Sequence, residues 1–305
     1  MENASLKSAD IRSERGLADT SPAAPSAAPR STVAVIVHSF FVVPFLIAVF
    51  SALLYVAVRL LTRGEDTAYD YLNDIKAGGF TQRWQAAFEL AKLMSNPAAM
   101  PKEERFIAEM TAAFEQSQHD PSPMVRQYLA LAMGRSGDQA YVSPLVAALG
   151  RETDDNRPYL LHALGMLRDP QSVDGIKPYV ADRDARVRLQ AVMALGNLGD
   201  PGVVDQLKLA LQDPEPNVQW ESAVALAKLG DASGRAVLLN LLDRDYWSRY
   251  PEVDNYERNQ AILTAMQAGA LLHDPELDTA IRALSQNDPN MNVRRTATAL
   301  LKDVS

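Results

Sequence analysis

A 31-residue repeat constrains the fold of this chain more than any other feature of its sequence. The most regular copy is Val187–Leu211, and an aspartate marks the same turn in each copy. These aspartates are Asp138, Asp169, Asp200 and Asp231, and a further one, Asp274, follows after an insertion of 12 residues. A fixed period of this length is the signature of a solenoid, in which each unit packs against its neighbours.

Each repeat encodes two helices joined by a tight turn. In the copy that begins at Val187, apolar residues recur at the three- and four-residue spacing of one helical face. The sequence Gly199, Asp200, Pro201 predicts the end of that helix and the start of another. We expect the alanines to let the two helices approach closely. One hairpin leaves apolar surface exposed unless neighbours stack on both sides, so we predict an all-α α-solenoid.

The repeat resembles a known family. Its front half, D-x-x-x-x-V-R, and its back half, A-x-x-A-L-G-x-L-G-D, are similar to the HEAT repeat, in the short form of phycobilisome-lyase-type HEAT proteins. Front halves stand at 120–126, 182–188 and 288–294, and back halves at 194–200 and 225–231. The resemblance covers roughly residues 80–305 and implies six to seven HEAT-like hairpins in an armadillo-like superhelix. In the lyases, the same scaffold presents a bilin to a client protein.

The chain that precedes the repeats predicts a tail and a membrane anchor. Residues 1–32 are rich in Ala, Ser and Pro without an apolar period, which is typical of a disordered tail. Residues 33–58 contain no Asp, Glu, Lys or Arg, so we predict one transmembrane helix at 33–61, bent at Pro44. We interpret residues 64–79 as a linker helix that leads into the solenoid at 80–305.

The predicted span places the protein in a membrane as a single-pass protein, of the bacterial inner-membrane type. The side of the membrane on which the solenoid lies stays open, because the charges that flank the span favour different orientations. Arg59 and Arg63 next to the span favour the solenoid inside, whereas Lys7, Arg12 and Arg15 in the tail resist export of the tail. A signal anchor with its tail inside is the commoner arrangement, which favours the solenoid on the exported side.

An insertion at 243–258 interrupts the period and gathers aromatic and arginine side chains. Insertions in solenoids lie at one edge and often bind partners, and Tyr, Trp and Arg dominate interface energies. The alternative, that the rings pack on the solenoid's own core, stays open at this stage. The candidate partner-binding residues are Tyr246, Trp247, Arg249, Tyr250 and Tyr256.

Composition narrows the chemistry that this chain could perform. Cysteine is absent, and the net charge is −8, of which residues 64–305 carry −10, so nucleic acid is not the expected partner. No His-Glu pair of the kind that holds iron in deoxyhypusine hydroxylase, a HEAT-like enzyme, is present. We interpret His162 as a packed core histidine, and the recurring Asp and Arg, such as Asp182 and Arg188, as a ladder between loops. We expect no metal and no cofactor.

These observations predict a membrane-anchored HEAT-repeat scaffold or adaptor that binds a protein partner, and no enzyme. Two alternatives remain. One is a regulatory subunit of a membrane complex, whose bent helix packs against other spans. The other is an enzyme of the lyase or metal-hydroxylase type on the same scaffold.

Overall fold

The computed structural model describes residues 42–62, 66–98, 100–153 and 155–303, with the backbone alone at 59–62 and 303. The chain divides into two compact units, Met1–Gly64 and Glu65–Ser305. The described part of the first unit consists mainly of helix α2 (Val43–Thr62), in which large apolar side chains such as Phe45, Phe50 and Leu53 are exposed.

The structure gives no support to the predicted transmembrane helix at 33–61. Of the helices in the described ranges, none is long and apolar enough to cross a membrane. Residues 33–41 of the predicted span lie outside the described residues, as does the whole of the predicted tail at 1–32.

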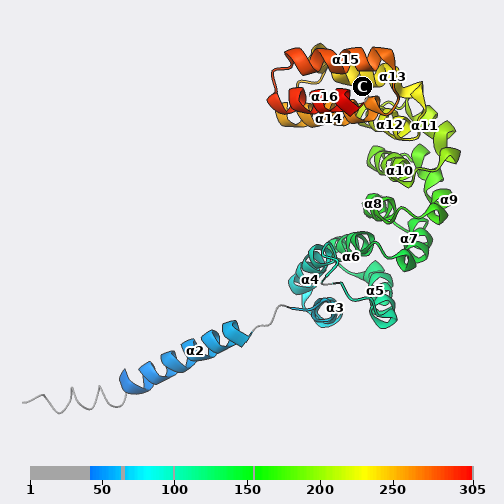
Figure 1. Cartoon of the computed structure of the whole chain (residues 1–305). Helices are drawn as coiled ribbons and strands as arrows, with labels where there is room; N and C mark the ends of the chain where they lie inside the picture. Colours follow the sequence, from blue (N-terminus) through cyan, green and yellow to red (C-terminus); the bar gives the residue numbers. More distant parts are fainter. Residues whose placement is uncertain (1–41, 63–65, 99, 154, 304–305) are drawn as a thin grey trace, which may run out of the picture. The chain divides into compact units, whose positions relative to one another are not determined.

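The second unit is a stack of helical hairpins (Figure 1). The first helices of the hairpins pack against one another in chain order and form what we call the first-helix layer. This layer consists of α4 (Phe80–Leu93), α6 (Pro123–Ser136), α8 (Arg157–Leu167), α10 (Ala185–Leu198), α12 (Pro216–Lys228), α14 (Asn255–Ala270) and α16 (Met291–Asp303).

The second helices form the second-helix layer. Its members are α5 (Glu104–Gln116), α7 (Val142–Leu149), α9 (Val173–Ile176), α11 (Val204–Ala210), α13 (Arg235–Leu242) and α15 (Pro275–Asn287). Helix α3 (Ala68–Ala77) packs against α4 and α5 and buries Leu72 and Ile75. Within the described residues every regular element is helical, which confirms the all-α solenoid.

The turns have the geometry that the aspartate pattern predicts. In four repeats the Oδ1 atom of the aspartate accepts a hydrogen bond of 2.7 to 2.9 Å from the backbone N–H two residues further on. The residue before the aspartate has a positive φ, which glycine adopts without steric cost. Gly137, Gly199 and Gly230 fill this position in three repeats, and Arg168 and His273 hold it at φ 54° and 49° in two others.

Neighbouring first helices approach most closely where a glycine of one helix faces an alanine of the next. A Cβ atom on Gly134 would lie 2.7 Å from the Cα of Ala163, and one on Gly165 would lie 2.9 Å from the Cα of Ala194. Gly196 faces Ala225 in the same way. These alanines therefore set the spacing between successive repeats. A close approach within one hairpin, as the sequence predicts, occurs where Gly234 faces Ala223 of α12.

Arginine–carboxylate pairs join the loops of successive repeats, as the ladder interpretation predicts. Arg188 holds the carboxylate of Asp213 with two hydrogen bonds of 2.6 and 2.8 Å, and it donates a third, of 3.0 Å, to the carbonyl of Asp182. Each arginine thus links its own loop to the next one. The corresponding pairs are Arg83–Asp120, Arg126–Glu152, Arg157–Asp182 and Arg244–Asp288.

The close approach of first helices makes a prediction about stability. Gly134→Ala should lower the free energy of unfolding by about 1–3 kcal/mol, because the added methyl group must displace the backbone of α8. Gly150→Ala is the matched control: no atom lies within 4 Å of its added Cβ and its φ is −70°, so its stability should stay equal or rise. Urea denaturation followed by circular dichroism measures both, and a Gly134→Ala variant as stable as the wild type would refute the close-packing account.

Candidate functional site

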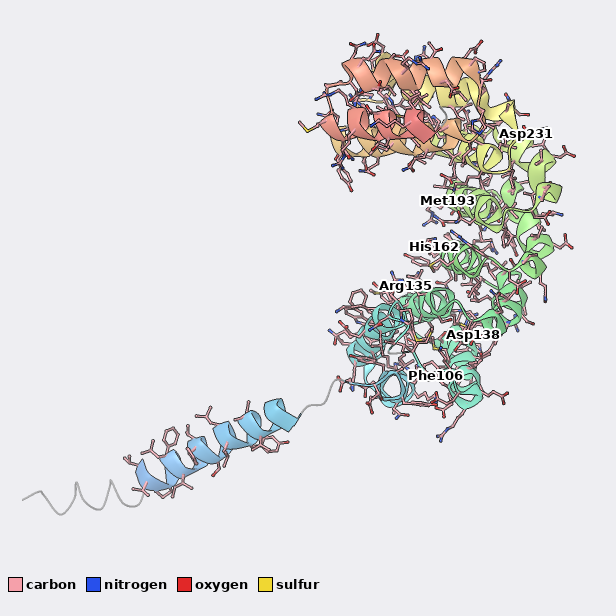
Figure 2. The ribbon with its side chains drawn as sticks, in the orientation of Figure 1. Phe106, Arg135, Asp138, His162, Met193 and Asp231 are labelled. Atoms are coloured by element: carbon pink, nitrogen blue, oxygen red, sulfur yellow. The ribbon has the colours of Figure 1, made fainter. Side chains whose placement is uncertain are left out.

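Side chains spaced 31 residues apart form rows along the exposed face of the first-helix layer. Because the period is constant, equivalent residues of α6, α8, α10 and α12 lie next to one another. Figure 2 shows Arg135, His162 and Met193 on this layer, while Asp138 and Asp231 lie at the turns between the layers. The three rows are Gln127, Pro158, Leu189 and Trp220; Tyr128, Tyr159, Gln190 and Glu221; and Leu131, His162, Met193 and Val224.

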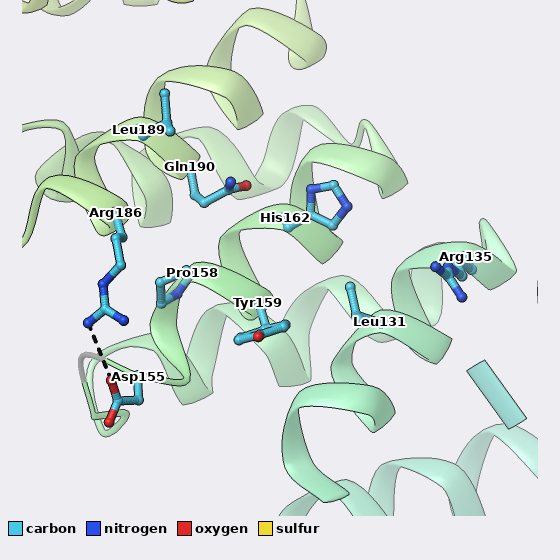
Figure 3. A pocket seen from close by; sticks show the side chains of 9 residues that line it. All are labelled: Leu131, Arg135, Asp155, Pro158, Tyr159, His162, Arg186, Leu189 and Gln190. Carbon is cyan, nitrogen blue, oxygen red and sulfur yellow. Dashed lines mark hydrogen bonds and ion pairs between the residues drawn. The ribbon is translucent and has the colours of Figure 1, made fainter. Parts of the chain in front are cut away.

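A hollow of about 520 Å³ lies across α6, α8 and α10 (Figure 3). Tyr159 and His162 of α8 lie between Leu131 of α6 and Gln190 of α10 in this view. Polar groups stand at two edges of the hollow. The complete lining consists of Leu131, Arg135, Asp155, Pro158, Tyr159, His162, Arg186, Leu189 and Gln190.

Two further hollows continue the first one along the same layer. A hollow of about 250 Å³ between α10, α12 and α14 shares Leu189 with the first. A third, of about 530 Å³ between α12, the insertion and α14, shares Asn217, Trp220 and Ala261 with the second. We call the three hollows together the groove. The lining of the groove comes from α6, α8, α10, α12 and α14 of the first-helix layer and from the insertion, together with Leu241 of α13 in the second-helix layer.

The structure corrects the interpretation of His162 as a core histidine. Its side chain is exposed in the groove, and Ala163, the next residue, is the one that packs against the neighbouring helix. Burial against the groove wall lowers the pKa of His162, the positive charge of Arg135 lowers it further, and a contact with Gln190 opposes both. Together these effects favour the neutral form of the imidazole.

Charge is distributed unevenly along the groove. Arg135 and Arg186 stand at the end formed by α6 and α10, where Arg186 pairs with Asp184 at 2.7 Å. Glu221 lines the middle, and burial raises its pKa while Lys228 lowers it. The far end carries three glutamates, Glu215, Glu252 and Glu257.

The structure places four of the five predicted partner-binding residues in one aromatic cluster. Trp247 is fully buried, and its indole N–H donates to the carbonyl of Leu241 at 3.1 Å. Tyr246 and Tyr250 are half-buried, and their hydroxyl oxygens form a hydrogen bond of 3.1 Å. The guanidinium carbon of Arg249 lies over the ring of Tyr246, 5.6 Å from its centroid. Tyr256, on α14, is 71% exposed and belongs to no ring pair of this cluster. Their role in partner binding stays a prediction.

Sequence reasoning missed the residues that connect the hollows. Leu189 and Trp220 lie in the periodic helices, and the sequence analysis singled out neither of them, because an apolar residue in such a helix ordinarily belongs to the core. Glu221 belongs to no sequence motif that indicates a function. A signal was present all the same: aligned at the 31-residue period, its row changes from Tyr128 and Tyr159 to Gln190 and Glu221, which a purely buried position would not tolerate.

Comparison with protein families finds HEAT repeats in this chain. The family model described as HEAT repeats matches residues 173–250, and the model described as PBS lyase HEAT-like repeat matches residues 125–151. The predicted resemblance to the short HEAT repeat is confirmed by both matches. A comparison with curated protein sequences gives no match.

Solved structures with the same architecture include three of known description. The complex of CpcE and CpcF of phycocyanin lyase from Nostoc sp. PCC7120 matches with 18% identity and a TM-score of 0.53, over 80% of this chain and 97% of that one. The YibA protein of E. coli matches with 16% identity and a TM-score of 0.49, over 81% and 85%. A computationally designed armadillo repeat protein for modular peptide recognition matches with 15% identity and a TM-score of 0.37, over 78% and 99%. At 18% identity the likeness to the first of these structures shows the solenoid fold alone.

These matches correct the expectation that the chain is not an enzyme. The exclusion rested on the absence of known catalytic motifs, but a fold shared with a phycocyanin lyase and a PBS lyase HEAT-like repeat at 125–151 contradict it. The absence of catalytic motifs was therefore the wrong criterion.

The setting of His162 makes a prediction about its titration. Its pKa should lie below the ordinary value of 6.5, and Arg135→Met should raise it because a nearby positive charge is removed. The stability that this shift contributes is present above the unfolded pKa, about 6.5, and is lost as the pH falls through the folded pKa. NMR titration of labelled histidine measures the shift. Arg295→Met, on the distant α16, is the control, and an Arg135→Met variant with an unchanged His162 titration would contradict the assignment.

Proposed function

We propose that this chain is a HEAT-repeat scaffold that binds an extended segment of a partner protein in the groove. The observation that carries the proposal is the continuity of the groove, in which Leu189 and Trp220 each belong to two adjoining hollows. A succession of small hollows along one layer suits a linear segment that places one side chain after another, whereas a compact ligand would need one deep cavity.

The residue types in the groove favour a protein partner. Tyr159, Leu189 and Trp220 are partly exposed on helices whose backbones are fixed by stacking, so their contact area costs little conformational entropy to use. His162 and Gln190 supply hydrogen-bonding groups between the apolar surfaces. The aromatic cluster of the insertion forms one wall of the third hollow through Tyr250, with Trp247 buried behind it, so the insertion contributes to this binding surface.

Substitution of Leu189 tests the groove directly. Leu189→Glu places a charge where two hollows meet and removes the apolar contact of the leucine with the partner. Loss of that contact costs about 1.5 kcal/mol or more, so partner binding should weaken at least about tenfold. Leu209→Glu is the matched control, because Leu209 is an exposed leucine on α11 of the second-helix layer and lines none of the three hollows.

The partner is identified by a photocrosslinking amino acid at Tyr159, with Leu209 as the control position, followed by mass spectrometry of the attached peptide. Binding constants for the identified peptide are then compared between the two glutamate variants. Equal weakening by Leu189→Glu and Leu209→Glu, or the same crosslinked peptide from both positions, would count against the groove.

Membrane attachment forms the second part of the proposal. Residues 33–58 carry no charged side chain, and in the described helix α2 the apolar side chains Phe50, Leu53 and Leu54 are exposed. We propose that residues 33–61 attach the solenoid to a bacterial-type inner membrane as a single pass, with the solenoid on the exported side. Apolar surface of this extent, without charge, is stabilised by contact with lipid.

Alkaline extraction of membranes tests this attachment. The full chain should remain in the membrane pellet, and replacement of both Phe50 and Leu54 by Asp should release it, because a charge within the apolar stretch costs about 2.5–3.5 kcal/mol at a membrane centre. Protease added to intact spheroplasts should then digest the solenoid. Release of the wild-type chain by alkali would refute the attachment, and protection of the solenoid would reverse its side.

A second candidate function is that of a lyase acting on a phycocyanin-type client. It is favoured by the PBS lyase HEAT-like match at 125–151, which covers α6 and α7 and includes Leu131 and Arg135 of the groove. The test is incubation of the full chain with a chromophore-free phycocyanin subunit and a free bilin. Bilin fluorescence that stays with the denatured subunit above the level without the chain would support it, and no increase would remove it.

A further inference from the structure

The third hollow of the groove differs from the other two in its charge. It lies between the start of α12, the insertion and the start of α14, and has a volume of about 530 Å³. Its lining includes the rings of Trp220 and Tyr250 and the carboxylates of Glu215, Glu252 and Glu257, and no lysine or arginine.

The aromatic wall of this hollow is held in place by direct contacts. The indole N–H of Trp220 donates to the hydroxyl of Tyr246 at 3.1 Å, and that hydroxyl lies 3.1 Å from the hydroxyl of Tyr250. The rings of Trp220 and Tyr250 meet edge to face, with centroids 5.1 Å apart and planes at 85°. Trp247 lies buried behind them, 5.2 Å from Trp220. Such a preformed wall presents ring surface without reorganisation.

Within the described residues none of the three carboxylates at this hollow forms an ion pair. Glu257 accepts the backbone N–H of Asp254 at the start of α14. Glu215 and Glu252 are exposed, and within the described part of the chain neither forms an ion pair. Arg188, whose charge interacts with Glu215, is already held by two hydrogen bonds to Asp213.

We propose that the third hollow takes a cationic side chain, arginine or lysine, from the segment of the partner protein that lies in the groove. Ring faces attract a cation, most strongly those of tryptophan, and the two carboxylates supply the opposite charge. This inference rests on the proposed function and names the chemistry of its partner. It also sets a direction: the cationic residue lies at the insertion, and the rest of the segment runs toward the hollow that Arg135 lines.

Model peptides test the charge preference with the full chain in a mild non-ionic detergent. The probes are three acetylated, amidated hexapeptides in which glycine alternates with arginine, with glutamine or with glutamate. Of the three tryptophans of the chain, Trp220 lines the hollow and Trp247 lies directly behind it, so tryptophan fluorescence reports binding. The arginine peptide should bind at least about tenfold more tightly than the glutamine peptide, with an affinity that falls as salt rises, and the glutamate peptide should not bind.

A matched pair of variants separates the hollow from the overall negative charge. Glu215→Gln with Glu252→Gln should weaken the arginine peptide about fivefold or more. Glu103→Gln with Glu104→Gln, at the exposed start of α5, changes the net charge by the same amount and should leave the affinity unchanged. Equal binding of the three peptides, or equal weakening by both pairs, would overturn the inference.

The two proposals fail in different ways. A partner peptide crosslinked at Tyr159, together with no preference for arginine, would refute the cationic hollow and leave the groove in place. A clear preference for arginine without any crosslinked partner would refute binding of a partner in the groove and leave the cationic preference of the third hollow in place.

Discussion

The contact between a glycine of one first helix and an alanine of the next is the constraint on which the rest of this structure depends. At Gly134 and Gly165 even one methyl group would come within 3 Å of the neighbouring backbone. Helices that approach this closely bury the side of the first-helix layer that carries the small residues. Their larger side chains are turned to the flanks, where they either enter the core between the layers or line the groove.

The arginine ladder complements this contact at the level of the loops. Arg188 reaches across to Asp213, and the same arrangement recurs in most repeats, so the loops hold the register that the helices set. The ladder changes at the insertion. Gln219 occupies the position of Arg188 one repeat later and bonds only to the carbonyl of Asp213, while Arg244 pairs with Asp288 across the insertion. The buried core divides into two clusters near the same place, at α12, and the aromatic rings of the insertion pack there.

Much of the fold could be predicted from the sequence, because the features that specify it are local and repeated. The aspartate at each turn caps the next element, as predicted at Asp200, and the apolar spacing identified the helices. The side of the repeat that faces a groove could not be predicted in this way. His162 belongs to the same row as Leu131 and Met193, whose apolar side chains suggested burial. At His162, however, this row lies at the edge of the first-helix layer, and the side chain is exposed. Periodicity indicates that a helix has an apolar side, but it does not predict where on the helix that side ends.

The candidate site was predictable only in part for the same reason. The insertion was recognised by its composition, and three of its four rings form one cluster, but Trp247 lies in the core and the exposed ring surface belongs partly to Trp220, a repeat residue. Whether a ring packs inward or faces a hollow depends on the path of the insertion over α12 and α14, which is a tertiary property. The absence of catalytic motifs was likewise a poor guide to enzyme class on a scaffold shared with a lyase.

The central claim is that partners bind along the first-helix layer, and hydrogen–deuterium exchange of the full chain with and without its crosslink-identified partner peptide tests it most directly. Binding in the groove predicts slower exchange in α8, α10 and α12 and in the insertion, with little change in α7 and α11. Protection confined to the second-helix layer, or spread evenly over both layers, would contradict the claim.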